Sequence, residues 1–191
     1  MASEISTANR VSEGDLQVLQ NLGISVVNQR PMKVQVVRWL RPPSGRLKLN
    51  LDGSCRGNPS IGGGGGILWN HEGSLVFAFS SFFYSCTNNK AELRAVVERI
   101  EICCQRGHFF IDLECDSLVV VSWLVGRYCT VWYLWDFRDQ LMSPLEGFEI
   151  TIMHLSKEGN KVADELARCG ALGEEFLVSE VAQLTRSLQG L

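Results

Sequence analysis

The sequence predicts an α/β domain with a five-stranded mixed sheet flanked by helices, for three reasons. After residue 45, segments with strand and helix patterns follow one another as three strands, a helix, a strand, a helix, a strand and a helix, which is typical of α/β domains. The chain has 191 residues, enough for one substantial hydrophobic core. Four acidic residues lie at strand ends or in the first turns of helices, where α/β sheets gather functional groups: Asp52, Glu92, Asp116 and Asp164.

Residues 1–45 are predicted to form an N-terminal arm or linker. Hydrophobic periodicity is weak there, although a short helix near residues 14–22 fits the pattern. The run Pro42-Pro43-Ser44-Gly45 then breaks the chain. We therefore expect the folded domain to occupy residues 46–172, directly after this break.

The domain is predicted to begin with three antiparallel strands. Residues 47–52 alternate between apolar and polar side chains, and strands over 67–69 and 75–84 are joined by a turn at 70–73. Five glycines, 62–66, precede the second strand. They lack the Lys-Ser or Lys-Thr that would follow in a phosphate-binding loop, so we interpret them as a tight entry into the strand.

A helix is expected to open at Asn88-Asn89, because apolar side chains then recur at helical spacing until Gly107 ends the pattern. Residues 109–115 are an apolar fourth strand. Asp116-Ser117 would cap the following helix over 118–125. That segment is rich in valine, so a strand remains the alternative.

The last third of the domain is predicted to contain a helix, the fifth strand and a final helix. These occupy residues 133–142, 148–154 and 158–169, the last with one apolar face. The tail, 173–191, has the pattern of a short amphipathic helix.

Composition narrows the class of protein. Hydrophobic residues make up 46% and charged residues 20% of the chain, which is ordinary for a globular domain. No apolar run is long enough to cross a bilayer, and residues 1–10 lack the apolar core of a signal peptide, so we expect neither membrane insertion nor secretion. Seven cysteines without a CxxC pair indicate reduced thiols in an intracellular protein, in the cytoplasm or the nucleus. The net charge of −3 lacks the excess of positive charge that is typical of nucleic-acid-binding domains.

Each of the four acids also has an ordinary structural interpretation. Asp52 could open a turn before Gly53, and Asp116 could cap a helix. Glu92 could be a capping partner for Asn89, three residues earlier, and Asp164 could be a solvated helix residue. Together they predict a site for hard divalent cations. Four carboxylates brought close to one another would repel, and magnesium prefers oxygen ligands.

Four ordered motifs resemble those of the type 1 ribonuclease H family. They are Leu-Lys-Leu-Asn-Leu-Asp-Gly-Ser-Cys-Arg-Gly-Asn at 47–58, Thr-Asn-Asn-Lys-Ala-Glu-Leu at 87–93, Glu-Cys-Asp-Ser at 114–117, and His154 followed by Asn160 and Asp164. The resemblance covers about residues 46–170. Val37-Arg38-Trp39 and the prolines after it also resemble the lead-in of plant ribonuclease H-like domains, many of which derive from non-LTR retrotransposons.

This resemblance implies cleavage of the RNA strand of an RNA–DNA hybrid by a monomeric metal-dependent endonuclease, once part of a larger reverse-transcriptase polyprotein. Two Mg²⁺ ions, or Mn²⁺, would be held by Asp52, Glu92, Asp116 and Asp164. His154 would assist proton movement or product release, and its ordinary alternative is a strand-end histidine bonded to the backbone. Substrate contacts are implied at Cys55, Gly57, Asn58, Thr87 and Asn88.

Some positions depart from the family pattern. Only Arg127 and Arg138 are basic between Asp116 and His154, so the basic handle of some relatives is lacking. Leu118 and Ser85 stand where polar and basic residues often contact the hybrid. Two alternatives therefore stay open: a catalytically inactive domain that binds nucleic acid or protein, and a nuclease for another substrate such as double-stranded RNA.

Overall fold

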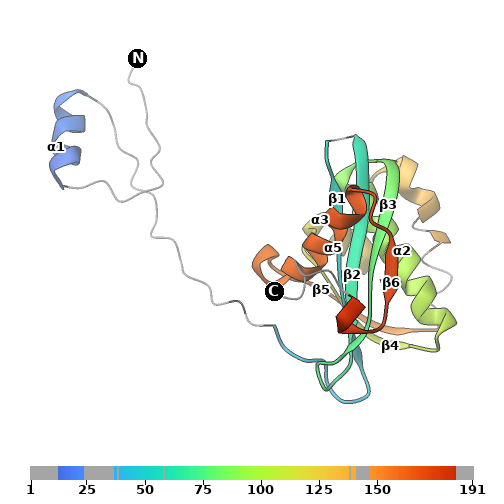
Figure 1. Cartoon of the computed structure of the whole chain (residues 1–191). Coiled ribbons are helices and arrows are strands. Elements are labelled where there is room, and N and C mark those ends of the chain that lie inside the picture. The colour runs from blue at the N-terminus through green and yellow to red at the C-terminus, as the bar shows by residue number, and fades with distance from the viewer. Residues whose placement is uncertain are drawn as a thin grey trace. The chain divides into compact units, whose positions relative to one another are not determined.

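A computed structural model of the chain describes residues 13–23, 37, 39–57, 59–137, 139–140 and 147–183 (Figure 1). Internal contacts divide the chain into two units, the second of which begins at Val37. In the first unit, α1 (Glu13–Asn21) is the short helix expected near 14–22. Within the described residues no helix is both long and apolar enough to span a membrane.

The second unit is built on a six-stranded mixed sheet with the order β5-β4-β1-β2-β3-β6. The pairs β1–β4 and β4–β5 are parallel. The pairs β1–β2, β2–β3 and β3–β6 are antiparallel. The strands are β1 (Leu47–Cys55), β2 (Ser60–Trp69), β3 (Leu75–Cys86), β4 (Phe110–Cys115), β5 (Glu149–His154) and β6 (Phe176–Val178). The predicted α/β class is confirmed, but the expectation of five strands was wrong by one.

The additional strand, β6, lies in the tail where a helix had been expected. Its three residues pair with Ala78, Phe79 and Ser80 of β3. The Ser80 hydroxyl donates to the carbonyl of Glu174 at 2.7 Å, which fixes the chain at the start of the strand. After β6, the short 3-10 helix η3 (Val181–Gln183) follows. The tail therefore forms an edge strand, because the backbone groups of β3 offer hydrogen-bond partners.

Helices lie on both faces of the sheet (Figure 1): α2 (Asn88–Gln105), α3 (Leu118–Gly126) and α5 (Lys161–Ala171). The valine-rich segment is a helix and not a strand, since the Ser117 hydroxyl accepts from the amide of Val120 and caps its first turn. Short 3-10 helices are η1 (Trp132–Leu134) and η2 (Lys157–Gly159).

Two predicted helices differ from those observed. In the segment 133–142, η1 precedes helical residues 135–137 and 139–140, and 138 and 141–146 lie outside the described residues. The last helix begins at Lys161 and not at 158. Residues 157–159 form η2, in which the Gly159 amide donates to the carbonyl of Ser156.

The five glycines lie inside β2, and the expectation that they only lead into the strand was wrong. A Cβ atom at Gly65 would lie 2.0 Å from the amide nitrogen of Ala167, and one at Gly63 would lie 2.3 Å from that of Ala171. No side chain fits at such distances, so α5 packs with its backbone directly on β2. This close approach fixes α5, which carries Asp164, against the centre of the sheet.

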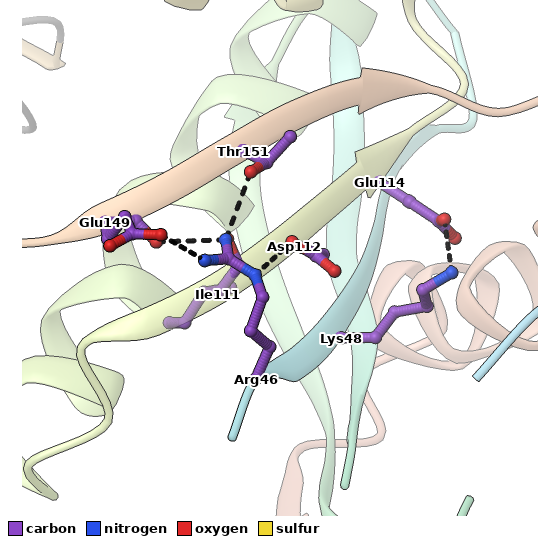
Figure 2. Close-up of polar contacts among 7 residues, drawn as sticks. All are labelled: Arg46, Lys48, Ile111, Asp112, Glu114, Glu149 and Thr151. Carbon is purple, nitrogen blue, oxygen red and sulfur yellow. Dashed lines mark hydrogen bonds and ion pairs between the residues drawn. The ribbon is translucent and has the colours of Figure 1, made fainter. Parts of the chain in front are cut away.

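Arg46, directly before β1, links β1 to the parallel strands β4 and β5 (Figure 2). These contacts lie at the end of the sheet opposite Asp52 and Asp116. Its guanidinium donates to the carboxylates of Asp112 and Glu149, both at 2.7 Å, and to the Thr151 hydroxyl at 3.1 Å. Asp112 belongs to β4, and Glu149 and Thr151 belong to the edge strand β5. The single arginine therefore holds β5 in its register with β4.

A buried polar network joins the segment before β1 to the sheet. Lys48 and Asn50 donate to the two carboxylate oxygens of Glu114 at 2.6 and 2.8 Å. The Trp39 indole donates to Asn50 and packs edge-on against Trp69, with ring centroids 5.3 Å apart. Through these contacts Trp39 packs on the sheet, and it lies within the compact unit that begins at Val37.

Candidate metal and nucleic-acid site

All four acidic residues line one pocket of about 380 Å³. Asp52 comes from β1, Glu92 from the second turn of α2, Asp116 from the residue directly after β4, and Asp164 from the first turn of α5. The parallel pairing of β1 with β4 brings Asp52 and Asp116 to the same end of the sheet. The fold thus assembles carboxylates that are separated by up to 112 positions along the chain.

Glycine at position 53 makes this assembly sterically feasible. A Cβ atom there would lie 2.1 Å from the amide nitrogen of Glu92, so only glycine lets β1 approach the start of α2 so closely. The helix begins at Thr87, whose hydroxyl accepts from the amide of Lys90. Asp116 does not cap α3, because Ser117 does. Its carboxylate is therefore available to the pocket.

The pocket is electrostatically costly without a cation. Asp52 is 5% exposed, and its burial, together with the charges of Glu92 and Asp116, raises its pKa from the ordinary value of 3.8 to about 10. Burial and then the charge of Asp116 raise the pKa of Glu92 to about 8. The carboxyls resist ionisation because each lies in a poorly solvated place beside like charge. A bound cation would remove both causes.

The donor set fits a hard divalent cation better than a soft one. Ligand atoms of Glu92, Cys115 and Asp116 lie within 4.8 Å of one another. However, burial raises the pKa of the Cys115 thiol well above its usual value, and its sulfur donates to Glu92 at 3.4 Å. A protonated thiol is a poor ligand. Carboxylate oxygens are left as the available donors, and these suit Mg²⁺ or Mn²⁺.

His154 ends β5 beside the pocket but does not line it. Its Nε2 atom lies 3.1 Å from the backbone carbonyl oxygen of Asp116, and its side chain is exposed. Both interpretations of this residue agree with the geometry: it is a strand-end histidine bonded to the backbone, and it stands next to a metal-binding candidate. Its exposed ring thus lies adjacent to Asp116.

Two of the five residues expected to contact substrate line the pocket. Cys55 and Asn88 line the pocket, and Thr87 caps α2 next to them. Gly57 lies in the bend after β1. Asn58 lies outside the described residues. The rim thus combines a helix start, which exposes amide N–H groups, with short polar side chains.

The pocket also contains residues that were not predicted as site residues, namely Ser54, Asn89, Ser117 and Lys157. The first three are small polar residues next to predicted ones. Lys157 carries a positive charge among the four acids. It comes from the short turn η2, where an exposed lysine has no pattern that distinguishes it from a solvated one.

The sheet order and the acidic pocket define an α/β fold with a carboxylate site for divalent cations, and comparison with known proteins identifies its family. Residues 50–170 match the model of the reverse transcriptase-like family, so the chain belongs to that family. It is 29% identical over 143 residues to a ribonuclease H of Cyanothece sp., a match that covers 67% of this chain and 90% of the relative.

Two further relatives extend the comparison. A ribonuclease H-like protein of Arabidopsis thaliana is 29% identical over 140 residues, which cover 72% of this chain but only 22% of the longer protein. The crystal structure of RNase H1 from Halobacterium salinarum superposes with a TM-score of 0.63 at 30% identity, over 68% of this chain and all of that one. The predicted ribonuclease H fold and enzyme class are thereby confirmed.

Proposed function

We propose that the protein is a divalent-metal-dependent endonuclease that hydrolyses the RNA strand of RNA–DNA hybrids. The observation that carries this proposal is the convergence of Asp52, Glu92, Asp116 and Asp164 in one pocket. Burial and mutual repulsion keep the pKa of Asp52 and of Glu92 far above their usual values. Such a cluster is expensive to maintain unless a cation binds it. The ribonuclease H relatives support this substrate class.

The four carboxylates would hold two Mg²⁺ ions, or Mn²⁺, and we propose that each of the four takes part. When bound, these ions would supply an activated water and stabilise the charge on the leaving oxygen of the cleaved phosphodiester. Substrate binding and proton exchange would be carried out by residues of the chain. Asn88 and the amide N–H groups at the start of α2 would bind phosphate oxygens of the strand.

Two further parts of the rim would recognise the RNA strand and handle protons. Backbone groups at Cys55 and Gly57 would face the RNA 2′-hydroxyls, which distinguish RNA from DNA, with Asn58 and Thr87 contacting the backbone. His154 would exchange a proton with the water or the leaving group. Its place next to Asp116 and its exposure to solvent suit that exchange.

The proposal is tested with a labelled RNA–DNA hybrid in Mg²⁺ or Mn²⁺. We expect cleavage of the RNA strand that is lost in chelator and lost in Asp52→Asn. Absence of cleavage with either metal at high enzyme concentration would refute the proposed activity and favour an inactive domain that binds nucleic acid or protein. Cleavage of double-stranded RNA without cleavage of the hybrid would assign a different substrate.

We also propose that the domain acts as a monomer inside the cell, in the cytoplasm or the nucleus, and derives from a plant non-LTR retrotransposon polyprotein. All seven cysteines are free thiols, which supports a reducing compartment. The reverse transcriptase-like family and the longer Arabidopsis relative support the origin. Size-exclusion chromatography with light scattering would test the oligomeric state.

A further inference from the structure

We propose that Lys157 binds the phosphate group at the cleavage position, an inference that rests on the proposed function and extends it to a residue with no assigned role. Lys157 lines the acidic pocket. Among the described residues that line it, this is the one cationic side chain. The pocket therefore offers a single positive charge to an anionic substrate.

The backbone around Lys157 is anchored next to Asp52, so the lysine is not on an independent loop. Asn160 is 1% exposed, and its side-chain amide donates to the carbonyl oxygen of Leu51 at 2.8 Å. Its backbone amide donates to the carbonyl of Lys157 at 3.1 Å. This one asparagine ties the turn that carries Lys157 to the strand residue directly before Asp52.

The same asparagine also positions the metal-binding helix. The carbonyl oxygen of Asn160 accepts from the amide of Asp164 at 3.0 Å, in the first turn of α5. At Gly159 a Cβ atom would lie 2.9 Å from the Leu155 side chain, so the turn packs closely on that residue. Lys157, Asp164 and Asp52 thus keep a defined arrangement around the pocket.

The lysine ammonium is available for a ligand. Within the described part of the chain it makes no ion pair, although four carboxylates share its pocket. Two cations of α2 are engaged elsewhere: Lys90 donates to the carbonyl of Ser85, and Arg94 pairs with Glu98 at 2.8 Å. Lys157 is therefore free to contact an incoming phosphate.

The charge balance of the pocket explains why a cation at position 157 would favour substrate binding. Two divalent ions would cancel the four carboxylates and leave the pocket neutral, whereas the phosphodiester brings one negative charge. One ammonium group matches that charge. Charged contacts of this kind also compensate in part for the basic handle that the sequence lacks between Asp116 and His154.

The test compares Lys157→Ala with Lys161→Ala in the full chain. Lys161 is the matched control: it lies four residues away, is also exposed, and lines a different pocket beside Trp39 and Trp69. We expect Lys157→Ala to lower kcat/KM for hybrid cleavage about ten- to a hundredfold. Lys161→Ala should change it less than about threefold. Lys157→Arg should restore most of the loss.

A second readout does not depend on metal or on activity. In chelator, the fluorescence anisotropy of a labelled hybrid gives its Kd at several salt concentrations. Lys157→Ala should weaken binding several-fold and reduce the slope of log K against log salt by about 0.9, the value for one phosphate contact. Thermal unfolding of both variants confirms that the fold is retained.

The outcomes separate this inference from the proposed function. If the wild-type chain cleaves hybrid and Lys157→Ala matches Lys161→Ala in both assays, the lysine is only a solvated turn residue and the inference is wrong. If the wild-type chain cleaves nothing, the proposed function fails. The binding assay in chelator still tests whether Lys157 contributes to hybrid binding, since equal Kd values for the two variants would overturn its role.

Discussion

Asp52→Asn should stabilise the metal-free protein while it abolishes activity. The folded-state pKa of Asp52 is raised to about 10 from an ordinary 3.8, chiefly by burial. Between these two values the folded chain keeps a proton on Asp52 that the unfolded chain has released. The unfolded state therefore binds fewer protons, and stability falls as the pH rises through this window.

The size of the effect follows from the pKa difference. Each pH unit inside the window costs about 1.4 kcal/mol, so Asp52 alone should lower the free energy of unfolding by roughly 2–3 kcal/mol between pH 5 and pH 7. Asparagine has nearly the same shape and does not ionise. At pH 7 in chelator we expect Asp52→Asn to be about 2–4 kcal/mol more stable than the wild type, with a flatter pH dependence.

Asp164→Asn provides the matched control, since Asp164 lines the same pocket but is exposed. It should lose activity without gaining comparable stability. The measurement is urea denaturation at pH 5, 6 and 7, with and without Mg²⁺. Added Mg²⁺ should stabilise the wild type and reduce the advantage of Asp52→Asn. Parallel curves for wild type and Asp52→Asn across this pH range would refute the electrostatic reasoning.

Three further predictions concern the architecture around the site. Gly65→Ala should destabilise the protein by about 3 kcal/mol in urea denaturation, because its Cβ would lie 2.0 Å from the backbone of α5; Gly147→Ala, with no atom within 4 Å, should cost less than about 0.5 kcal/mol. Arg46→Ala should cost about 2–4 kcal/mol, because β4 and β5 lose a shared donor; a loss under about 1 kcal/mol would contradict this. Cys55 and Cys86, whose sulfurs lie 3.8 Å apart, should form the first disulfide on treatment with oxidised glutathione, seen as a cross-linked peptide by mass spectrometry. Preferential cross-linking of any other pair would show that the ends of β1 and β3 are not adjacent.

Periodicity and local cap chemistry were sufficient to predict most helices and strands. Alternation marked the first strands, and apolar spacing marked α2. The three-residue strand β6 was missed because so short a segment acquires its structure from hydrogen bonds to β3, which lies far away in the sequence. The start of the last helix was misplaced because η2 has the same composition as a first helical turn.

The sequence also pointed to the four acids, because each stood in a motif at a strand or helix end. It could not show that Lys157 shares their pocket, since nothing distinguishes a lysine in a polar turn from its exposed neighbours. The glycines of β2 were similarly ambiguous. Their reason became visible only in the distances between their missing side chains and the backbone of α5.

The chain itself therefore determined most of the elements and their order, the family and the identity of the metal-binding candidates, because these depend on local patterns and on residue chemistry. Tertiary structure decided which groups meet. Burial beside Glu92 and Asp116 changes Asp52 from an ordinary carboxylate into one with a strongly raised pKa. Asn160 ties the turn that carries Lys157 to β1, and Lys157 lines the same pocket as the acids. Such effects depend on distance and solvent exclusion, which exist only once β1, β4, α2 and α5 have packed together.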